Sequence, residues 1–162
     1  MNLIEEIAGE ICKIILPIEE EVFFGNSKSN IAICTLSSIT LLQDISKSPI
    51  INDVAIVGRL LSENKGIDAL VRSMLSNKKI DILILYGKEV LGHKSGDSLI
   101  CLHKNGIDEN HRIMGSSSPH PILTLTKKQV LEFQNQVKII NKIGETSISK
   151  LTGIVESLKK TQ

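Results

Sequence analysis

The sequence predicts a single α/β domain with a Rossmann-like, open and mostly parallel sheet and helices on both faces. A length of 162 residues suits one domain with a real hydrophobic core. Isoleucine occurs 26 times, which favours several buried strands over a helical bundle. Continuous apolar runs of strand length lie at residues 30–36, 53–57 and 80–86, and a helical pattern separates the last two. A strand, a helix and a strand within about 30 residues indicate a βαβ unit.

The first sixteen residues are predicted to form an element of their own. Apolar side chains recur at spacings of three and four over residues 3–16, and Pro17 ends the pattern. Such spacing is typical of an amphipathic helix. We therefore divide the chain into an N-terminal amphipathic helix at residues 1–16 and an α/β domain at residues 17–162.

The middle of the domain follows the βαβ pattern. The three apolar runs are predicted to be buried parallel strands. Asn64 stands at the entry of the helix that connects the second and third runs. The loop after the third run leads into a helix at residues 95–104, and Asn105 and Gly106 are a favourable pair to end it.

The last third of the chain is predicted to add two strands and two helices. Residues 112–114 indicate a short fourth strand. Thr126 and Gln129 have the spacing of a capping box, which opens a helix. Residues 138–143 indicate a fifth strand, and residues 148–158 form a terminal amphipathic helix.

Composition excludes several classes of function. Nineteen basic and eighteen acidic residues leave a formal charge of +1, so no strong field attracts nucleic acid or an anionic membrane. Four aromatic residues are too few for the stacking surfaces of single-strand binders. Three scattered cysteines without a CxxC motif indicate neither disulfides nor a thiolate zinc site. With no apolar run of about 18 residues, we expect no transmembrane segment and a cytoplasmic location.

The richest candidate site is the loop at residues 87–97, because ligands of such sheets bind outside the carboxyl ends of the strands. Two of its glycines have the spacing of a phosphate-binding loop, and Lys94 and Ser95 follow them. His93 intervenes before the lysine, however, so the register is displaced by one residue. The alternative is that His93 projects from the loop as a metal ligand.

Hydroxyl groups elsewhere at this edge are weaker candidates. Thr35, Ser37 and Ser38 follow the first predicted strand and could bind polar groups of a ligand, although such hydroxyls equally often bind turn backbone. The serine- and proline-rich segment at residues 115–121 is a loop, and its His120 could border a bound cofactor.

The other histidines and cysteines are expected to be structural. His103 has helical spacing from apolar neighbours and is predicted to pack within a helix, whereas His111 is predicted to be solvated in a turn. Cys34 in a strand and Cys101 in a helix are expected to be buried thiols.

The residues around His93 resemble part of a cofactor-binding signature. The sequence from His93 to Gly96 matches the His-x-x-Gly part of the Asp-x-His-x-x-Gly signature of corrinoid-binding modules. Leu91 stands where the signature has its aspartate, which orients the imidazole through a hydrogen bond. Glu89 and Asp97 are the nearby acids expected to be able to replace it. Asp97 also lies in a first helical turn, where an acid is favourable in any case.

A longer resemblance covers roughly residues 17–150. The chain is similar to the A subunit of tetrahydromethanopterin S-methyltransferase from methanogenic archaea. The stretch from Glu89 to Asp97, Glu-Val-Leu-Gly-His-Lys-Ser-Gly-Asp, is the most specific part. Further segments that carry the similarity lie at residues 31–36, 63–67, 84–88, 102–108 and 112–115.

The resemblance implies a corrinoid (cobalamin) cofactor. In that family the histidine of this motif is the lower axial ligand of the cobalt, so His93 is implied to be both the catalytic residue and the metal ligand. The loops after the first, third and fourth predicted strands are implied to hold the ring. The implied cofactor-binding residues are Thr35, Ser37, Asn64, Gly87, Gly92, His93, Ser95, Gly96, Asp97, Gly115, Ser116 and Pro119.

The resemblance also implies a reaction and partners. The cobalt takes a methyl group from methyl-tetrahydromethanopterin and passes it to coenzyme M in methanogenesis, while His93 binds and is released. In the family, other subunits of a membrane complex couple this reaction to sodium translocation at the cytoplasmic face. The family's A subunit ends in a transmembrane helix, which these 162 residues do not contain. A soluble homologue and a truncated form of the anchored protein are both expected alternatives.

Three hypotheses therefore stay open. The first is a corrinoid-carrying methyl-transfer domain. The second is a paralogue that binds or scavenges corrinoid without the sodium pump. The third is a nucleotide-binding domain that uses residues 87–95 as a phosphate loop.

Overall fold

One five-stranded sheet organises the chain. The computed structural model describes residues 21–160, so the helix predicted at residues 3–16 lies outside the described residues, and the division at residue 16 stays a prediction. The sheet has the order β1-β3-β2-β4-β5, and β1 alone is antiparallel to its neighbour. The strands are β1 (Val22–Phe24), β2 (Ile31–Cys34), β3 (Ile56–Gly58), β4 (Ile82–Gly87) and β5 (Lys138–Ile143).

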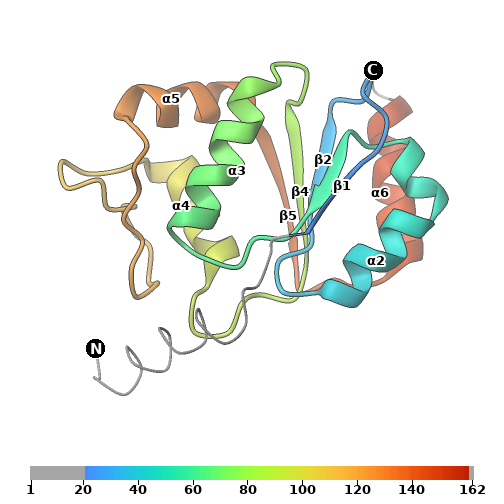
Figure 1. Cartoon of the computed structure of the whole chain (residues 1–162), viewed down its shortest axis with the longest axis horizontal. Coiled ribbons are helices and arrows are strands. Elements are labelled where there is room, and N and C mark those ends of the chain that lie inside the picture. Colours follow the sequence, from blue (N-terminus) through green and yellow to red (C-terminus); the bar gives the residue numbers. More distant parts are fainter. Residues whose placement is uncertain (1–20, 161–162) are drawn as a thin grey trace.

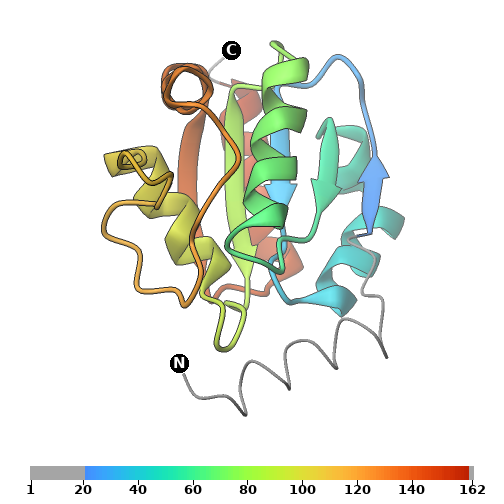
Figure 2. The same ribbon diagram turned by 60° about the vertical axis from the view of Figure 1, so that its left-hand side comes forward.

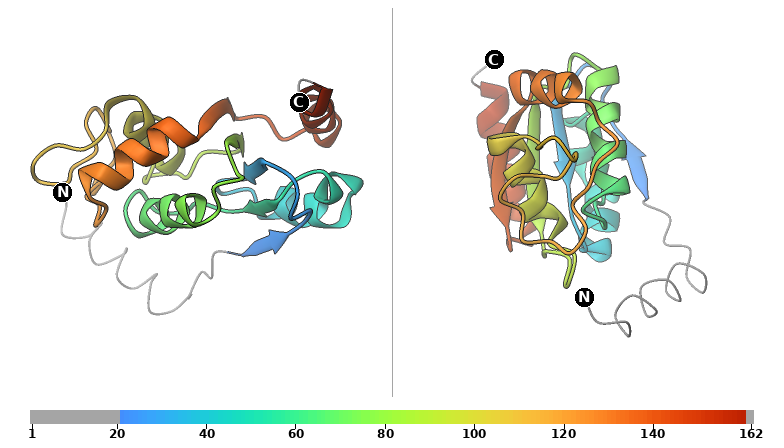
Figure 3. Two further views of the ribbon diagram at one scale, coloured as in Figure 1. Left: turned by 90° about the horizontal axis from the view of Figure 1, so that it is seen from above. Right: turned by 90° about the vertical axis from the view of Figure 1, so that its left-hand side faces the viewer.

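Helices cover both faces of this sheet. Figure 1 shows the sheet nearly edge-on, with α3, α4 and α5 on one side and α2 and α6 on the other, and Figure 3 shows the same layers from two further directions. Figure 2 shows the short strand β1 at the edge, beside β3. No helix within residues 21–160 is both long and apolar enough to span a membrane. The helices are α2 (Ile39–Lys47), α3 (Lys65–Ser76), α4 (Ser95–Asn105), α5 (Lys127–Gln136) and α6 (Ile148–Lys160), with a 3-10 helix η1 (Pro49–Asn52) after α2.

The central strand β4 explains why there are two hydrophobic cores. Successive side chains of a strand point to opposite faces. Leu83 and Leu85 accordingly pack in the core beneath α3, α4 and α5, whereas Ile84 and Tyr86 pack in the core beneath α2 and α6. All four are almost completely buried. A strand covered on both faces must be apolar throughout, which is why β4 is a continuous run rather than an alternating one.

Most of the predicted elements are confirmed. The three apolar runs overlap β2, β3 and β4, although β3 and β4 each end one residue later than predicted, and residues 138–143 form β5 parallel to β4. Asn64 caps α3 by accepting a hydrogen bond from the amide of Lys65, and Gly106 ends α4 with a positive φ of 74°. The predicted capping box of Thr126 and Gln129 is present in full at the start of α5.

Other parts of the fold differ from the prediction. Residues 112–114 do not form a strand of the sheet; Arg112 pairs only with Ile122, and Ile113 only with Ile107, as isolated bridges. Strand β1 and helix α2 were not predicted. Strand β1 has only three residues and is largely exposed, so it leaves little local signal. Helix α2 was missed although its apolar residues Ile39, Leu42 and Ile45 have helical spacing, a pattern that could have revealed it.

Candidate functional site

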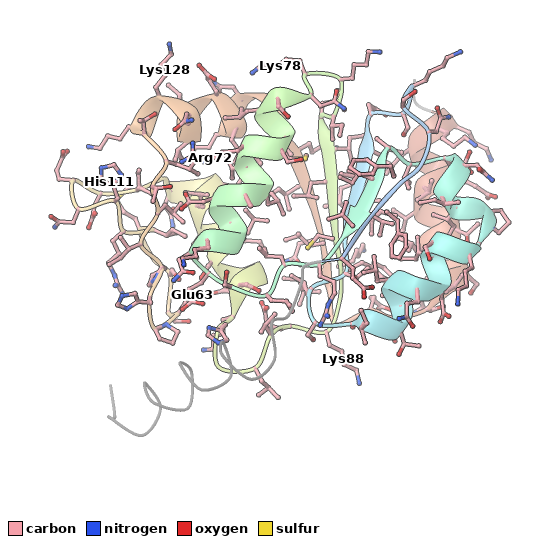
Figure 4. The ribbon with its side chains drawn as sticks, viewed as in Figure 1. Glu63, Arg72, Lys78, Lys88, His111 and Lys128 are labelled. Carbon is pink, nitrogen blue, oxygen red and sulfur yellow. The ribbon has the colours of Figure 1, made fainter. Side chains whose placement is uncertain are left out.

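The candidate site lies at the carboxyl edge of the parallel strands. Three segments meet there: the connection from β3 to α3 at residues 59–64, the connection from β4 to α4 at residues 88–94, and the loop at residues 115–121. Figure 4 shows Glu63 at the lower end of α3, the end of the molecule at which Lys88 marks the connection after β4. This is the edge at which open α/β sheets bind ligands.

His93 is held by a buried carboxylate. Its Nδ1 lies 2.8 Å from Oε2 of Glu63. The Glu63 side chain is 3% exposed, whereas the His93 side chain is 54% exposed. The other carboxylate oxygen, Oε1, accepts a hydrogen bond from the backbone N–H of His120 at 3.0 Å. Glu63 is therefore fixed from both sides and accepts the Nδ1 proton of His93.

This pairing determines which ring nitrogen can bind a metal. When Nδ1 of a neutral imidazole donates to a carboxylate, the lone pair available for coordination is on Nε2. Metal-binding histidines commonly have such an outer carboxylate, which fixes the ring and raises the basicity of the ligating nitrogen. His93 thus presents a partly exposed, oriented imidazole at the ligand edge of the sheet.

The expectation that Glu89 or Asp97 would orient His93 is wrong. Glu89 instead accepts hydrogen bonds from the backbone N–H groups of Gly96, at 3.0 Å, and Asp97, at 2.8 Å, and so caps the first turn of α4. Asp97 lies in that same first turn. Glu63, 30 residues before His93 in the sequence, supplies the orienting carboxylate.

The same cap contradicts the phosphate-loop hypothesis. In a phosphate loop, the helix N-terminus offers its free N–H groups to the bound anion. Here the Glu89 carboxylate already occupies that position at α4 and would repel a phosphate. The lysine of the motif, Lys94, directs its Nζ to the hydroxyl of Ser117 at 3.3 Å. The loop is therefore organised around its own acid.

Several predicted ligand-binding side chains support the loops from within. Thr35 and Ser95 are completely buried, and their hydroxyls donate to the carbonyls of Gly58 and Leu60. Direct contact with a bound ring is not available to either side chain. The hydroxyl of Ser37 lies within reach of two backbone carbonyls of the β4–α4 connection, at 2.8 and 3.2 Å. The turn-binding alternative therefore describes Thr35 and Ser37, and the hydroxyl of Ser95 likewise binds backbone.

The remaining predicted residues shape the edge through the backbone. Gly87 has a φ of +93°, and a Cβ there would lie 2.4 Å from the carbonyl oxygen of Thr35, so only glycine fits. Gly92 has a φ of +80° directly before His93. Gly115 and Pro119 are exposed in the loop beside the site. Ser116 is half-buried, and its Oγ lies 2.7 Å from the hydroxyl of Ser98.

The other three histidines have different roles. His103 is packed as predicted: its Nε2 lies 2.6 Å from the carbonyl oxygen of Val137, and its ring meets Phe133 edge-on. His111 is exposed, but its Nδ1 is held 2.9 Å from the carbonyl oxygen of Leu125. His120 is exposed at the site, where its backbone rather than its ring binds Glu63.

The two described cysteines are not arranged as ligands. Cys34 is buried in β2, as predicted, whereas Cys101 in α4 is only partly buried. Burial, and then the charge of Asp97, raises the pKa of the Cys101 thiol, while Lys104 partly offsets the rise. Within residues 21–160, no three His, Cys, Asp or Glu side chains are grouped to hold a metal ion.

Comparison with known proteins gives the site a family context. The family of the A subunit of tetrahydromethanopterin S-methyltransferase matches residues 15–162. The A subunit of the putative methyltransferase Mtx from Methanosarcina barkeri is 35% identical over 136 residues, which cover 83% of this chain and 65% of that protein. The tetrahydromethanopterin S-methyltransferase A subunit numbered 1 from Methanothermobacter thermautotrophicus is 34% identical over 128 residues, which cover 78% of this chain and 52% of that protein. The chain thus spans between about half and two thirds of the length of these relatives.

Proposed function

Because the chain belongs to the family of the tetrahydromethanopterin S-methyltransferase A subunit, we propose that it is a corrinoid-carrying methyl-transfer protein in which His93 is the lower axial ligand of cobalt. The observation that carries this proposal is the pair formed by the exposed imidazole of His93 and the buried carboxylate of Glu63. A bound corrinoid would supply the methyl-accepting and methyl-donating chemistry through its cobalt.

The residues of the chain hold and orient the ligand. Glu63 accepts the Nδ1 proton of His93 and leaves Nε2 to face the cofactor. The negative charge of Glu63, which is almost wholly shielded from water, makes Nε2 of the imidazole a stronger electron-pair donor to a metal. Gly92 and the exposed residues around His93 leave room for a large, flat ring to approach the loop. A nearly neutral chain needs no basic patch for a ring of this kind.

The site also suits a ligand that binds and is released. His93 lies on a connection whose residues 91–94 are all exposed, while the residues that anchor it, Glu63 and Ser118, are buried. The connection can therefore shift without opening either hydrophobic core. If His93 binds and leaves a bound corrinoid during each methyl transfer, this connection is the part of the site that would move.

We extend the proposal to substrates and partners on the basis of the relatives' names. Methyl-tetrahydromethanopterin is the proposed methyl donor and coenzyme M the proposed acceptor, both reached through other subunits of a membrane methyltransferase complex. The word subunit in the relatives' names supports such a complex. Sodium coupling and a place at the cytoplasmic face of the membrane belong to the same proposal.

A second candidate is a corrinoid protein of a related methyltransferase system that lacks the sodium pump. The relatives with the higher coverage of their own length support it, because they bear the name Mtx rather than that of the tetrahydromethanopterin enzyme. The two candidates differ in the donor. Corrinoid-loaded protein that is methylated by methyl-tetrahydromethanopterin with the other subunits supports the first, whereas methylation only by a different donor supports the second.

Electron paramagnetic resonance tests the axial ligand directly. The protein is loaded with hydroxocobalamin, reduced to the cobalt(II) form, and compared with protein grown on ¹⁵N-histidine. If His93 is the ligand, the nitrogen splitting of the cobalt signal changes from a triplet to a doublet with the label. His93→Ala should abolish the labelled-nitrogen splitting.

His120→Ala is the matched control for this experiment. It removes a second exposed imidazole at the same edge but keeps the backbone N–H that binds Glu63. The splitting should persist in this variant. Labelled splitting that survives His93→Ala, or a cobalt signal with no histidine splitting in the wild type, would overturn the proposal.

A further inference from the structure

A chain of three serine hydroxyls reaches the backbone carbonyl of His93. Ser118 Oγ lies 2.5 Å from the carbonyl oxygen of His93 and 3.2 Å from that of Lys94. Ser98 Oγ lies 2.5 Å from Ser118 Oγ and 2.7 Å from Ser116 Oγ. Ser98 and Ser118 are both buried. We infer that Ser118, supported by Ser98, is a positioning residue for His93, an inference that rests on the proposed function.

If the Ser118 hydroxyl donates to His93, the direction of every hydrogen bond among the three serine hydroxyls is determined. A carbonyl oxygen accepts but cannot donate, so Ser118 uses its one proton on the His93 carbonyl. Ser98 must then donate to Ser118, and Ser116 must donate to Ser98. A chain in which every hydroxyl both donates and accepts is strengthened by mutual polarisation. The chain ends at His93, the residue that binds the proposed cofactor.

The backbone at this point needs such a support. Gly92 has a φ of +80° and Lys94 a φ of 47°, so His93 lies between two residues in the left-handed region. Lys94 has a Cβ, unlike glycine, so the left-handed conformation is unfavourable for it and must be imposed by its surroundings. Ser118 contacts the carbonyls of both His93 and Lys94 and is placed to impose it.

The short segment at residues 118–120 therefore fixes both the backbone and the ring of His93. Ser118 holds the backbone of His93, and the N–H of His120, two residues later, holds the carboxylate that orients its ring. A displacement of residues 118–120 would move the backbone anchor and the ring anchor together. The ring orientation of His93 is thus coupled to this loop as well as to Glu63.

The test compares Ser118→Ala and Ser98→Ala with Ser117→Ala. Ser117 is exposed, and its hydroxyl bond is the one with Lys94 Nζ at 3.3 Å, so this variant removes a neighbouring hydroxyl outside the chain. Two properties are measured for each: the dissociation constant for hydroxocobalamin with the histidine-coordinated fraction, and amide hydrogen exchange of residues 92–96 without cofactor. Thermal unfolding shows which variants fold.

We expect Ser118→Ala to weaken histidine coordination about tenfold relative to Ser117→Ala, with a smaller effect of Ser98→Ala. Amide exchange at Lys94 and Ser95 should become faster in the same order. If Ser118→Ala does not fold, the decision rests on Ser98→Ala, which removes the support but keeps the contact with His93.

The possible outcomes separate this inference from the proposed function. Coordination and amide exchange equal to those of Ser117→Ala would overturn the positioning role even if the wild type binds corrinoid through His93. If the wild type fails to coordinate cobalt, the proposed function fails, and faster exchange confined to residues 92–96 would still establish that Ser118 holds this backbone. Faster exchange throughout the domain would identify Ser118 as a general structural residue and overturn the inference.

Discussion

Two strand-to-helix connections at the same edge of the sheet each carry a glutamate, and the two carboxylates do different work. In the connection from β4 to α4, Glu89 binds amides of its own helix, within eight residues in the sequence. In the connection from β3 to α3, Glu63 binds the imidazole of His93, 30 residues away. The local acid stabilises a helix, and the distant one, which is buried, orients the candidate ligand.

The comparison shows why proximity in sequence misleads here. A carboxylate close to a helix N-terminus meets free N–H groups and is drawn into a cap. It is then unavailable to a histidine a few residues away. Glu63 also lies next to a helix N-terminus, but Asn64 and Ser62 already accept hydrogen bonds from the first N–H groups of α3, those of Lys65 and Gly66. The Glu63 carboxylate is therefore available to His93. We therefore expect changes at Glu63 to weaken histidine coordination and changes at Glu89 to lower the stability of the fold.

Glu63→Gln should have the largest effect on the site. Glutamine keeps the shape of the side chain but loses the charge that strengthens the imidazole, so histidine coordination of bound hydroxocobalamin should weaken about 10- to 100-fold. The measurement is the dissociation constant together with the histidine-coordinated fraction. Glu89→Gln is the matched control, because it makes the same change in the neighbouring connection. Equal losses in both variants would remove the distinction between the two acids.

Among changes in the two connections, Glu89→Ala should lower the stability of the protein most. It leaves two amides of the first turn of α4 without their acceptor, which should cost about 1–2 kcal/mol in the free energy of unfolding. Urea unfolding with an unchanged slope measures this loss. Histidine coordination should persist in the folded protein. A variant that is as stable as the wild type but has lost histidine coordination would assign Glu89 to the site instead.

Tyr86 makes a hydrogen bond at the same edge of the sheet that involves no candidate ligand, because its partner, Ser147, lies in the connection after β5. Tyr86, at the end of β4, is buried and donates a hydrogen bond to the carbonyl of Ser147 at 2.8 Å. Tyr86→Phe should cost about 1 kcal/mol of stability at neutral pH by the loss of this bond. Chemical denaturation measures the loss, and histidine coordination should be unaffected. A loss of coordination here would mean that any disturbance of this edge reaches the site.

The same variant carries a pH dependence. Burial, and then the charge of Glu145, raises the pKa of Tyr86 above 10.0, and Lys150 partly offsets the rise. Below that pH the phenol is neutral in both states, so its stabilising effect is fully present. As the pH rises above about 10, the unfolded chain ionises first and stability falls. Tyr86→Phe should show a shallower decline above pH 10 than the wild type, and an equal decline would contradict the assigned cause.

The sequence predicts the fold better than it predicts the site. The apolar runs that became β2, β3 and β4 and the capping residues Asn64 and Thr126 are local signals, and the structure confirms them. The resemblance identifies His93 as the candidate ligand from its own motif. The partner Glu63 leaves no local signal, because the pairing is made by the sheet, in which β2 lies between the strands that carry the two residues.

The hydroxyl side chains show a second limit. Thr35 and Ser95 have the residue type and the position expected of ligand-binding groups. Which carbonyl each hydroxyl reaches depends on side-chain packing, and in the structure both are buried against neighbouring backbone. Glycine at position 87 is predictable in kind, since turns need a positive φ, but its contact with Thr35 comes from the pairing of β2 with β4.

Leu91→Asp should have the smallest effect and is the sharpest test of which acid orients the ring. It restores the aspartate of the corrinoid-binding signature at a side chain that is 96% exposed. An exposed substitution of this kind should change stability by less than about 0.5 kcal/mol. Because Glu63 already accepts the Nδ1 proton, we expect no gain in histidine coordination in the wild-type background. We expect none with Glu63→Gln either, because the side chain at position 91 lies in solvent whereas Nδ1 faces the buried position of residue 63. Titration with hydroxocobalamin measures both variants. If Leu91→Asp restored the coordination lost in Glu63→Gln, an acid within the loop would be able to orient His93. Glu63 would then orient the ring only because the loop lacks an aspartate at position 91, and not because a local carboxylate is unable to reach Nδ1.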